Sequence, residues 1–155
     1  MHRLDKWIPW MIGVVFAGVF VFYAFHATRT FSWIFIPDSG DWLTAAHQWL
    51  VPQPVGYPLY ILLGHFLNVL PGDLVLKLVL VLSCLASSVT VALTYLISLK
   101  LTKSVLISVA AAILLTGSAV FLTQSTIVEQ YALLTALLTC ALYFFICDRK
   151  MLTGL

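Results

Sequence analysis

The fold of this chain is decided by residues 74–98, which read LVLKLVLVLSCLASSVTVALTYLIS. The charged side chain in this run is Lys77, close to its beginning. As an α-helix rising about 1.5 Å per residue, the run is long enough to cross the ~30 Å hydrocarbon core of a bilayer. The sequence therefore predicts a membrane-spanning helix here.

Three further apolar runs accompany this one: Trp7 to about Phe25, Ser104 to Leu122, and about Gln130 to Cys147. The first follows a start, MHRLDKW, that resembles a signal peptide, but no A-x-A cleavage site comes after it. We expect this run to be a retained anchor. The expected fold is all-α: one membrane domain, residues 1–155, with four spanning helices.

Composition agrees with lipid as the solvent of this chain. Hydrophobic residues make up 62%, charged residues 9%, and the mean hydropathy is +1.05, whereas soluble domains carry roughly 25% charged residues. A net charge of +2 without a basic stripe excludes a nucleic-acid partner. The three cysteines lie inside apolar runs, so we expect them to be packing residues.

The segment GYPLYILLGHFLNVLP, residues 56–71, is ambiguous. About 15 residues extend only ~22 Å as a helix, so a re-entrant or interfacial helix in an outer loop, residues 27–73, is favoured over a crossing. The positive-inside rule supports this choice. It places six of the eight Lys and Arg residues in the cytoplasm, together with the amino terminus: Arg3, Lys6, Lys100, Lys103, Arg149 and Lys150. We expect a plasma (inner) membrane location.

The outer loop contains PDSGDWLTAAHQWL, residues 37–50. Trp42 and Trp49 share one face of a helical pattern, which predicts a short amphipathic helix in the headgroup layer. Asp38 and Asp41 stand at its beginning. They can cap this helix and complement its dipole, or serve as a general base or metal ligands, and the sequence leaves both roles open.

Glu129 lies in QSTIVEQYAL, at the expected outer edge of the last span. It is either a helix-terminal acid in water or a carboxylate of a site. The second interpretation gains support because Asp38 and Asp41 are expected on the same side and at the same depth. Tyr131 would point from the same turn as Glu129.

Two cations also belong to the outer side, Arg29 after the first run and Lys77 at the start of the second. Either is a snorkelling anchor or a cation that stabilises a phosphate leaving group. His26, His47 and His65 show no metal-ligand spacing, so we expect structural or interfacial roles for them.

Three motifs in this order, PDSGD, PQPVGYPLYILLG and IVEQYAL, resemble the start of the membrane family related to protein O-mannosyltransferases. Members of that family read close to GDSGE, HPPGYPLY with a following LLG, and a glutamate before YAL. The resemblance covers most of the chain from Pro37 onward. It implies the GT-C glycosyltransferase fold, with the outer loop and its juxtamembrane helices as the large first loop of such enzymes.

The resemblance also implies roles for individual residues. Asp38 falls on the DSG of the family and is the expected catalytic carboxylate, Asp41 takes the place of a glutamate, and Glu129 matches the acid before YAL. The expected substrate-binding residues are Lys77, Arg29, Gln53, Tyr57 and Tyr131. Gln53 and Val55 depart from the family pattern, which has a histidine and a second proline at these positions.

The implied function is transfer of a mannose-like sugar from a polyprenyl-phosphate donor to a hydroxyl of a protein or glycan at the outer face. Asp38 would take the acceptor proton, with Asp41 and Glu129 orienting the acceptor or holding a divalent cation. The rival expectation is a non-catalytic membrane subunit or a lipid-binding fragment that keeps the fold. A transporter is disfavoured because the spans lack internal charges and paired Gly/Pro breaks.

Enzymes with the GT-C fold have more spans than the four apolar runs found here. We therefore expect that the chain is a fragment of a longer enzyme, or that it is a split or degenerate member, or that it works only with a partner chain that supplies the remaining helices.

Overall fold

The computed structural model describes residues 8–30, 41, 44–45, 47–50, 58–67, 69–128 and 130–152, and the structural statements below concern these residues. They form α1 (Ile8–Thr30), α3 (Pro58–Leu67), α4 (Gly72–Thr102), α5 (Val105–Thr116), α6 (Ala119–Ser125) and α7 (Tyr131–Leu152). No strand occurs in the described part of the chain. The expected all-α class is confirmed.

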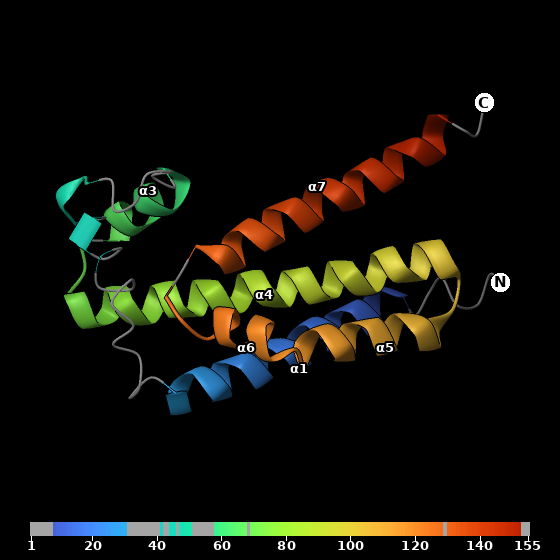
Figure 1. Cartoon of the computed structure of the whole chain (residues 1–155), viewed down its shortest axis with the longest axis horizontal. Coiled ribbons are helices and arrows are strands. Elements are labelled where there is room, and N and C mark those ends of the chain that lie inside the picture. Colours follow the sequence, from blue (N-terminus) through green and yellow to red (C-terminus); the bar gives the residue numbers. More distant parts are fainter. Residues whose placement is uncertain are drawn as a thin grey trace.

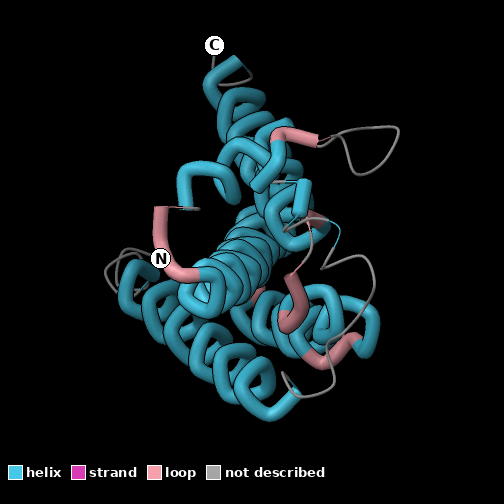
Figure 2. The backbone as a smooth tube through the Cα atoms, turned by 90° about the vertical axis from the view of Figure 1, so that its left-hand side faces the viewer, coloured by secondary structure: helices cyan, strands magenta, loops and turns pink. Residues whose placement is uncertain are grey.

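Helix α4 is the centre of the molecule. It packs against α1, α5 and α7. Helices α1 and α5 run antiparallel to α4, and α7 runs in the same direction as α4 (Figure 1). The view along the bundle shows these helices on different sides of α4 (Figure 2). The start of α1, the α4–α5 connection with Lys100 and Lys103, and the end of α7 lie at one end, called here the basic end (Figure 1). The opposite end, called here the loop end, carries α3 and the described residues between α6 and α7, 126–128 and 130 (Figure 1).

Length and composition support two or three membrane spans. Trp10–Ala27 in α1 and Lys77–Thr102 in α4 are long and apolar enough to cross a bilayer, and α5 with α6 qualifies as a bent pair. The apolar part of α7, Tyr131–Cys147, is shorter. The expectation of four spans is therefore confirmed only in part.

The third apolar run is not the continuous helix that the sequence suggested. It breaks between α5 and α6, whose axes differ by 67°. Gly117 ends α5, with its N–H donating to the Ile113 carbonyl, and Ser118 has an extended backbone that begins α6. Glycine is a poor helix former. The hydropathy pattern did not reveal this break because the residues on both sides are equally apolar.

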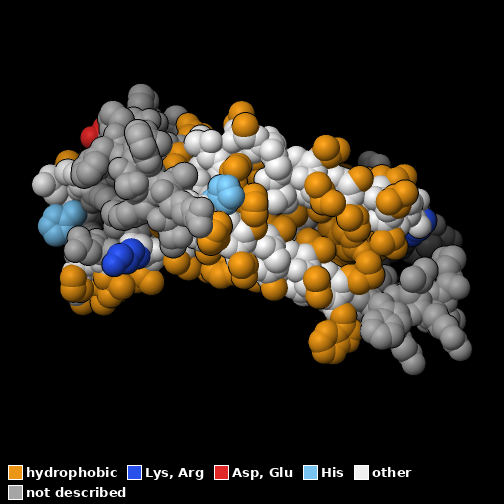
Figure 3. Space-filling view, turned by 90° about the horizontal axis from the view of Figure 1, so that it is seen from below, with side chains coloured by type: hydrophobic (Ala, Val, Ile, Leu, Met, Phe, Trp, Pro, Cys, Tyr) orange, Lys and Arg blue, Asp and Glu red, His pale blue; other side chains and the backbone are white. Residues whose placement is uncertain are grey.

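The outer surface of the bundle is apolar. Trp10 is 73% exposed, Leu106 80% and Leu114 75%. The face seen in Figure 3 carries hydrophobic side chains over its middle and Lys or Arg side chains near its two ends. Soluble monomers rarely expose apolar patches of this extent, so this surface fits a lipid environment.

Hydrogen bonds within α4 satisfy most of its serine and threonine hydroxyls. Hydroxyls of this helix donate to the carbonyl four residues earlier, among them those of Ser83, Ser88 and Thr90. Such bonds let polar residues lie in an apolar environment. Where α4 meets α7, the buried residues are small: Ala86, Ala132 and Ala136. Small residues allow membrane helices to approach closely.

Helix α3 is too short to cross a bilayer. Its ten residues extend ~15 Å, about half of a hydrocarbon core. It packs against α4 at the loop end (Figure 1). This agrees with the expected non-crossing helix within residues 56–71.

The described residues between 41 and 50 form a short helical segment that packs beside α3. It ends at Trp49, whose φ of 56° is left-handed, and the Leu50 N–H donates to the Ala45 carbonyl at 3.0 Å. The Trp49 indole lies 4.0 Å from the His65 ring of α3, between ring centroids. This ring contact ties the predicted amphipathic helix to α3.

Candidate functional site

A single hydrophobic cluster joins five segments at the loop end. Its buried members are Tyr23 and Ala27 of α1, Ala45, Tyr60 and Ile61 of α3, Val75, Val79, Leu80 and Cys84 of α4, and Val128. Tyr60 and Ile61 belong to the PQPVGYPLYILLG motif, Val128 belongs to the IVEQYAL motif, and Ala45 lies four residues after the end of PDSGD. Residues of two of the three motifs, far apart in the sequence, therefore pack into the same region of the molecule.

The connection between α6 and α7 is buried although it is not helical. From Ser125 to Val128, and again at Gln130, every described residue is at most 4% exposed. In a lipid-solvated protein, non-helical backbone is tolerated only where protein buries it or where it lines a water-filled cavity. Interrupted helices also form the ligand sites of many membrane proteins. This connection is the strongest sign of a site in the described residues.

Buried polar atoms without a hydrogen-bond partner lie beside this connection. They include Oε1 of Gln124 and Oε1 of Gln130, on either side of residues 125–129. An unpaired buried carbonyl oxygen costs about 1–3 kcal/mol. Atoms of this kind call for an explanation, such as a bound water or ion, and a polar ligand at this end of the bundle would supply the missing partners.

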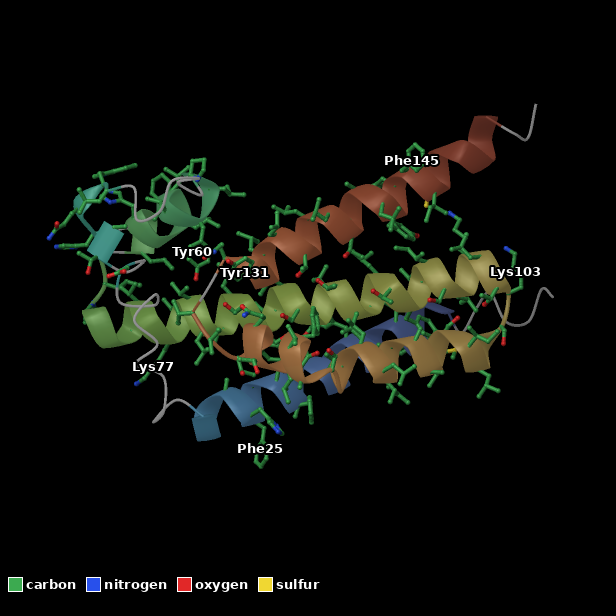
Figure 4. All side chains as sticks on the ribbon, viewed as in Figure 1. Phe25, Tyr60, Lys77, Lys103, Tyr131 and Phe145 are labelled. Carbon is green, nitrogen blue, oxygen red and sulfur yellow. The ribbon has the colours of Figure 1, made fainter. Side chains whose placement is uncertain are left out.

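The structure describes three of the expected site residues with their side chains. Asp41 is helical and exposed. Tyr131, the first residue of α7, is 42% exposed, and it lies with Tyr60 on the side of α4 that faces α3 and α7 (Figure 4). Lys77 is exposed and points to the opposite side of α4 (Figure 4). The structure therefore does not bring Lys77 together with Tyr131.

The remaining expected residues lie outside the described ones: Asp38, Gln53, Tyr57 and Glu129, and the side chain of Arg29 in the last turn of α1. Their roles stay predictions. The neighbours of position 129, Val128 and Gln130, are buried.

Among the described residues, no group of three or more His, Cys, Asp or Glu side chains could hold a metal ion. Asp38 and Glu129, two of the three acids expected near a divalent cation, are outside the described residues. The predicted cation is thus left open.

Sequence reasoning missed Gln124 and Gln130 as members of the site. Both are uncharged and lie between or at the edge of the predicted apolar runs, where an amide does not change the predicted spans. The signal that could have found them is their position, since they bracket the Ser-Thr-Ile-Val-Glu stretch. Two amides around one acid and two hydroxyl residues, between two apolar runs, indicate a polar environment.

Comparison with protein families decides the assignment. The model described as "Protein O-mannosyl-transferase TMEM260 N-terminal domain" matches residues 38–151. The chain belongs to this family. The match begins at Asp38 and includes the DSGD, GYPLY and VEQYAL motifs, so the resemblance seen in the sequence is confirmed. No curated protein and no solved structure matches the chain.

Membership in this O-mannosyl-transferase family, together with the apolar helices, makes the chain an integral membrane protein. The family name implies transfer of mannose to a protein hydroxyl, which agrees with the expected glycosyltransferase class.

Proposed function

We propose that this chain is a GT-C-type glycosyltransferase module that moves a mannose-like sugar from a polyprenyl-phosphate donor to a protein hydroxyl at the extracytoplasmic face. The observation that carries the proposal is the buried, non-helical α6–α7 connection. It contains Ile127, Val128 and Gln130 of the IVEQYAL motif, and Val128 shares one hydrophobic cluster with Ala45, which follows PDSGD. Family membership supplies the reaction class.

The proposed topology has four spans: α1, α4, the bent α5–α6 pair, and α7. Two features support it. The helices alternate in direction along the bundle (Figure 1), and α7 has 22 residues, ~33 Å as a helix. Lys100 and Lys103 lie at the same end as the start of α1, so the positive-inside rule makes the basic end cytoplasmic. The loop end is then extracytoplasmic.

In the proposed reaction, the acceptor hydroxyl gives its proton to the Asp38 carboxylate. At the same time, the oxygen of the acceptor hydroxyl bonds to the anomeric carbon of the sugar. The bond from that carbon to the phosphate oxygen breaks, and its electron pair leaves with the lipid phosphate. A hydroxyl is a weak nucleophile at neutral pH, so it needs a positioned base. Asp41 and Glu129 orient the acceptor or hold a divalent cation.

Cations at the loop end stabilise the leaving phosphate in this proposal. Arg29 at the end of α1 and Lys77 at the start of α4 are the cations of the proposal. Because Lys77 points to the side of α4 away from Tyr131 (Figure 4), Lys77 and Tyr131 would contact different parts of the donor. Gln53, Tyr57 and Tyr131 contribute to substrate binding. Tyr131 stands at the start of α7, directly after the buried connection.

The test is transfer from a radiolabelled polyprenyl-phosphate mannose to a serine- or threonine-containing peptide by the chain in proteoliposomes. Asp38→Asn should lower the rate about 100- to 10,000-fold, the usual contribution of a positioned base. The matched control is Asp73→Asn, which changes an acid in the first turn of α4 that has no role in the proposal. Undiminished transfer by Asp38→Asn, with normal membrane insertion, would end the assignment of Asp38.

A second candidate is a non-catalytic membrane subunit that keeps the fold. The observation that favours it is that the matching family model describes an N-terminal domain. The same assay separates the two candidates. Turnover by this chain alone excludes the subunit, whereas activity that requires an added partner chain supports it.

A further inference from the structure

A lysine and a cysteine meet at the basic end, away from the proposed site. The Nζ atom of Lys100 in α4 lies 2.7 Å from the Sγ atom of Cys147 in α7. The ring of Tyr143, one turn before Cys147, lies 5.5 Å from the same Nζ atom. A distance of 2.7 Å is at the short end of the range for N–H···O hydrogen bonds, about 2.7–3.2 Å, and sulfur is larger than oxygen. The nitrogen and the sulfur are therefore in direct contact.

This contact brings together a sulfur that can be oxidised and a nitrogen that can bond to the oxidised sulfur. A cysteine sulfur is the atom that peroxides oxidise, and the Lys100 nitrogen lies in contact with it, where it can give up a proton and then bond to the oxidised sulfur. The nitrogen, once deprotonated, is itself a nucleophile. Both side chains are half-buried, so a small reagent can reach them.

The other two cysteines lack this arrangement. Cys84 is 1% exposed, inside the hydrophobic cluster at the loop end. Cys140 lies two turns before Cys147 on the same face of α7 and is also half-exposed. No lysine contact is found for Cys140 within the described residues, so it is a matched control for Cys147.

We propose that Lys100 and Cys147 form a peroxide-responsive site in which hydrogen peroxide joins the two side chains by a sulfur–nitrogen bond. The Cys147 thiolate attacks one peroxide oxygen and the O–O bond breaks. The departing hydroxide takes a proton from the Lys100 ammonium group and becomes water. Sulfur is thereby oxidised to a sulfenic acid, peroxide is reduced, and the lysine becomes a neutral amine.

The second step needs no further oxidant. The Nζ lone pair attacks the sulfenic sulfur, the S–O bond breaks, and the leaving hydroxide takes a proton from nitrogen to form a second water. Sulfenic acids condense in this way with thiols and with backbone nitrogen. The contact between sulfur and nitrogen already holds the reactants in place, which accelerates a reaction of this kind. The product fastens α4 covalently to α7 at the basic end.

The experiment measures the intact mass of the purified chain in detergent before and after millimolar hydrogen peroxide. We expect a loss of two hydrogens from most molecules, and return to the original mass with dithiothreitol. Digestion after oxidation should give one linked peptide that contains both Lys100 and Cys147. Absence of this peptide from the oxidised wild-type chain overturns the proposal.

Two pairs of variants control the result. Cys147→Ser and Lys100→Arg should abolish the linkage, and Lys100→Arg should instead accumulate a sulfenic acid that reacts with dimedone. The controls make the same substitutions at neighbouring positions, Cys140→Ser and Lys103→Arg. Both control variants should still form the linkage between Lys100 and Cys147. A two-hydrogen loss that persists in Lys100→Arg but disappears in Cys140→Ser identifies a disulfide, and this also overturns the proposal.

Discussion

The two ends of the bundle are built in different ways. At the basic end, Lys103 closes α4 in a left-handed conformation and donates its N–H to the Leu99 carbonyl, and the Ser104 hydroxyl accepts from the Ile107 N–H to begin α5. Ser118, at the break between α5 and α6 in the middle of the bundle (Figure 1), begins α6 without a side-chain cap bond. At the loop end, buried residues that are not helical follow α6. The basic end is hydrogen-bonded as a structural joint, whereas the loop end leaves polar atoms unpaired.

The difference indicates where function lies. Buried polar atoms without hydrogen-bond partners reduce the stability of the fold. Their presence around one connection is therefore best explained by a role in binding a ligand. The capped helix ends of the α4–α5 connection need no ligand to explain them. Helices α4 and α7 pack against each other along the bundle. Variants that disturb this contact should therefore lower the stability of the whole bundle.

The largest expected effect on stability comes from Ala136→Leu, at the close contact between α7 and α4. Ala136 is 8% exposed in the cluster with Ala86 and Ala132, so three extra carbons must push the helices apart. We expect a loss of about 1–3 kcal/mol, as for other overpacked sites, measured by thermal unfolding in detergent. Ala141→Leu, exposed on the same helix, is the control and should change little.

The next variant, Gln130→Met, tests whether the unpaired oxygen at the loop end serves function. It replaces a 4% exposed amide by an apolar chain of similar length. Unfolding in detergent should be unchanged or require up to about 1–2 kcal/mol more, since a polar group without a partner is removed. Mannose transfer should fall about tenfold or more. Full activity in this variant would show that the unpaired oxygen of Gln130 has no role in function. The control is Gln48→Met, at an exposed position.

At the basic end, Ser104→Ala should cost about 1 kcal/mol, because it removes the cap of α5. The bond that is lost joins the Ser104 Oγ and Ile107 N atoms at 3.4 Å. The matched variant, Ser118→Ala, removes no cap bond from α6 and should change the unfolding temperature much less. Equal effects of the two variants would show that the cap bond of Ser104 does not stabilise the basic end.

The smallest effect is expected for Lys103→Gly. Lys103 has a φ of 58°, which glycine adopts without the steric cost that a Cβ atom imposes. The variant should raise the unfolding free energy by a few tenths to about 1 kcal/mol. A decrease instead would indicate that the Lys103 charge contributes more at this membrane boundary than its backbone strain costs.

Much of the architecture was predictable because apolar runs of sufficient length can be satisfied in lipid only as helices. The helices α1, α4 and α7 lie where these runs predicted them, and the short helix α3 falls in the segment that was judged too short to cross. The break at Gly117 was missed because hydropathy does not report backbone direction. Gln130 was missed because burial of an amide depends on the helices that surround it.

The family and the membrane environment were determined by the sequence itself: the motifs around Asp38, Tyr57 and Glu129 are local, and hydropathy is a sum over residues. The packing of Ala45 with Val128, the bend between α5 and α6, and the meeting of Lys100 with Cys147 were decided only by tertiary structure. The physical reason is that each of these joins residues far apart in the chain or depends on the neighbours of a helix end, and no local pattern encodes which surfaces come together.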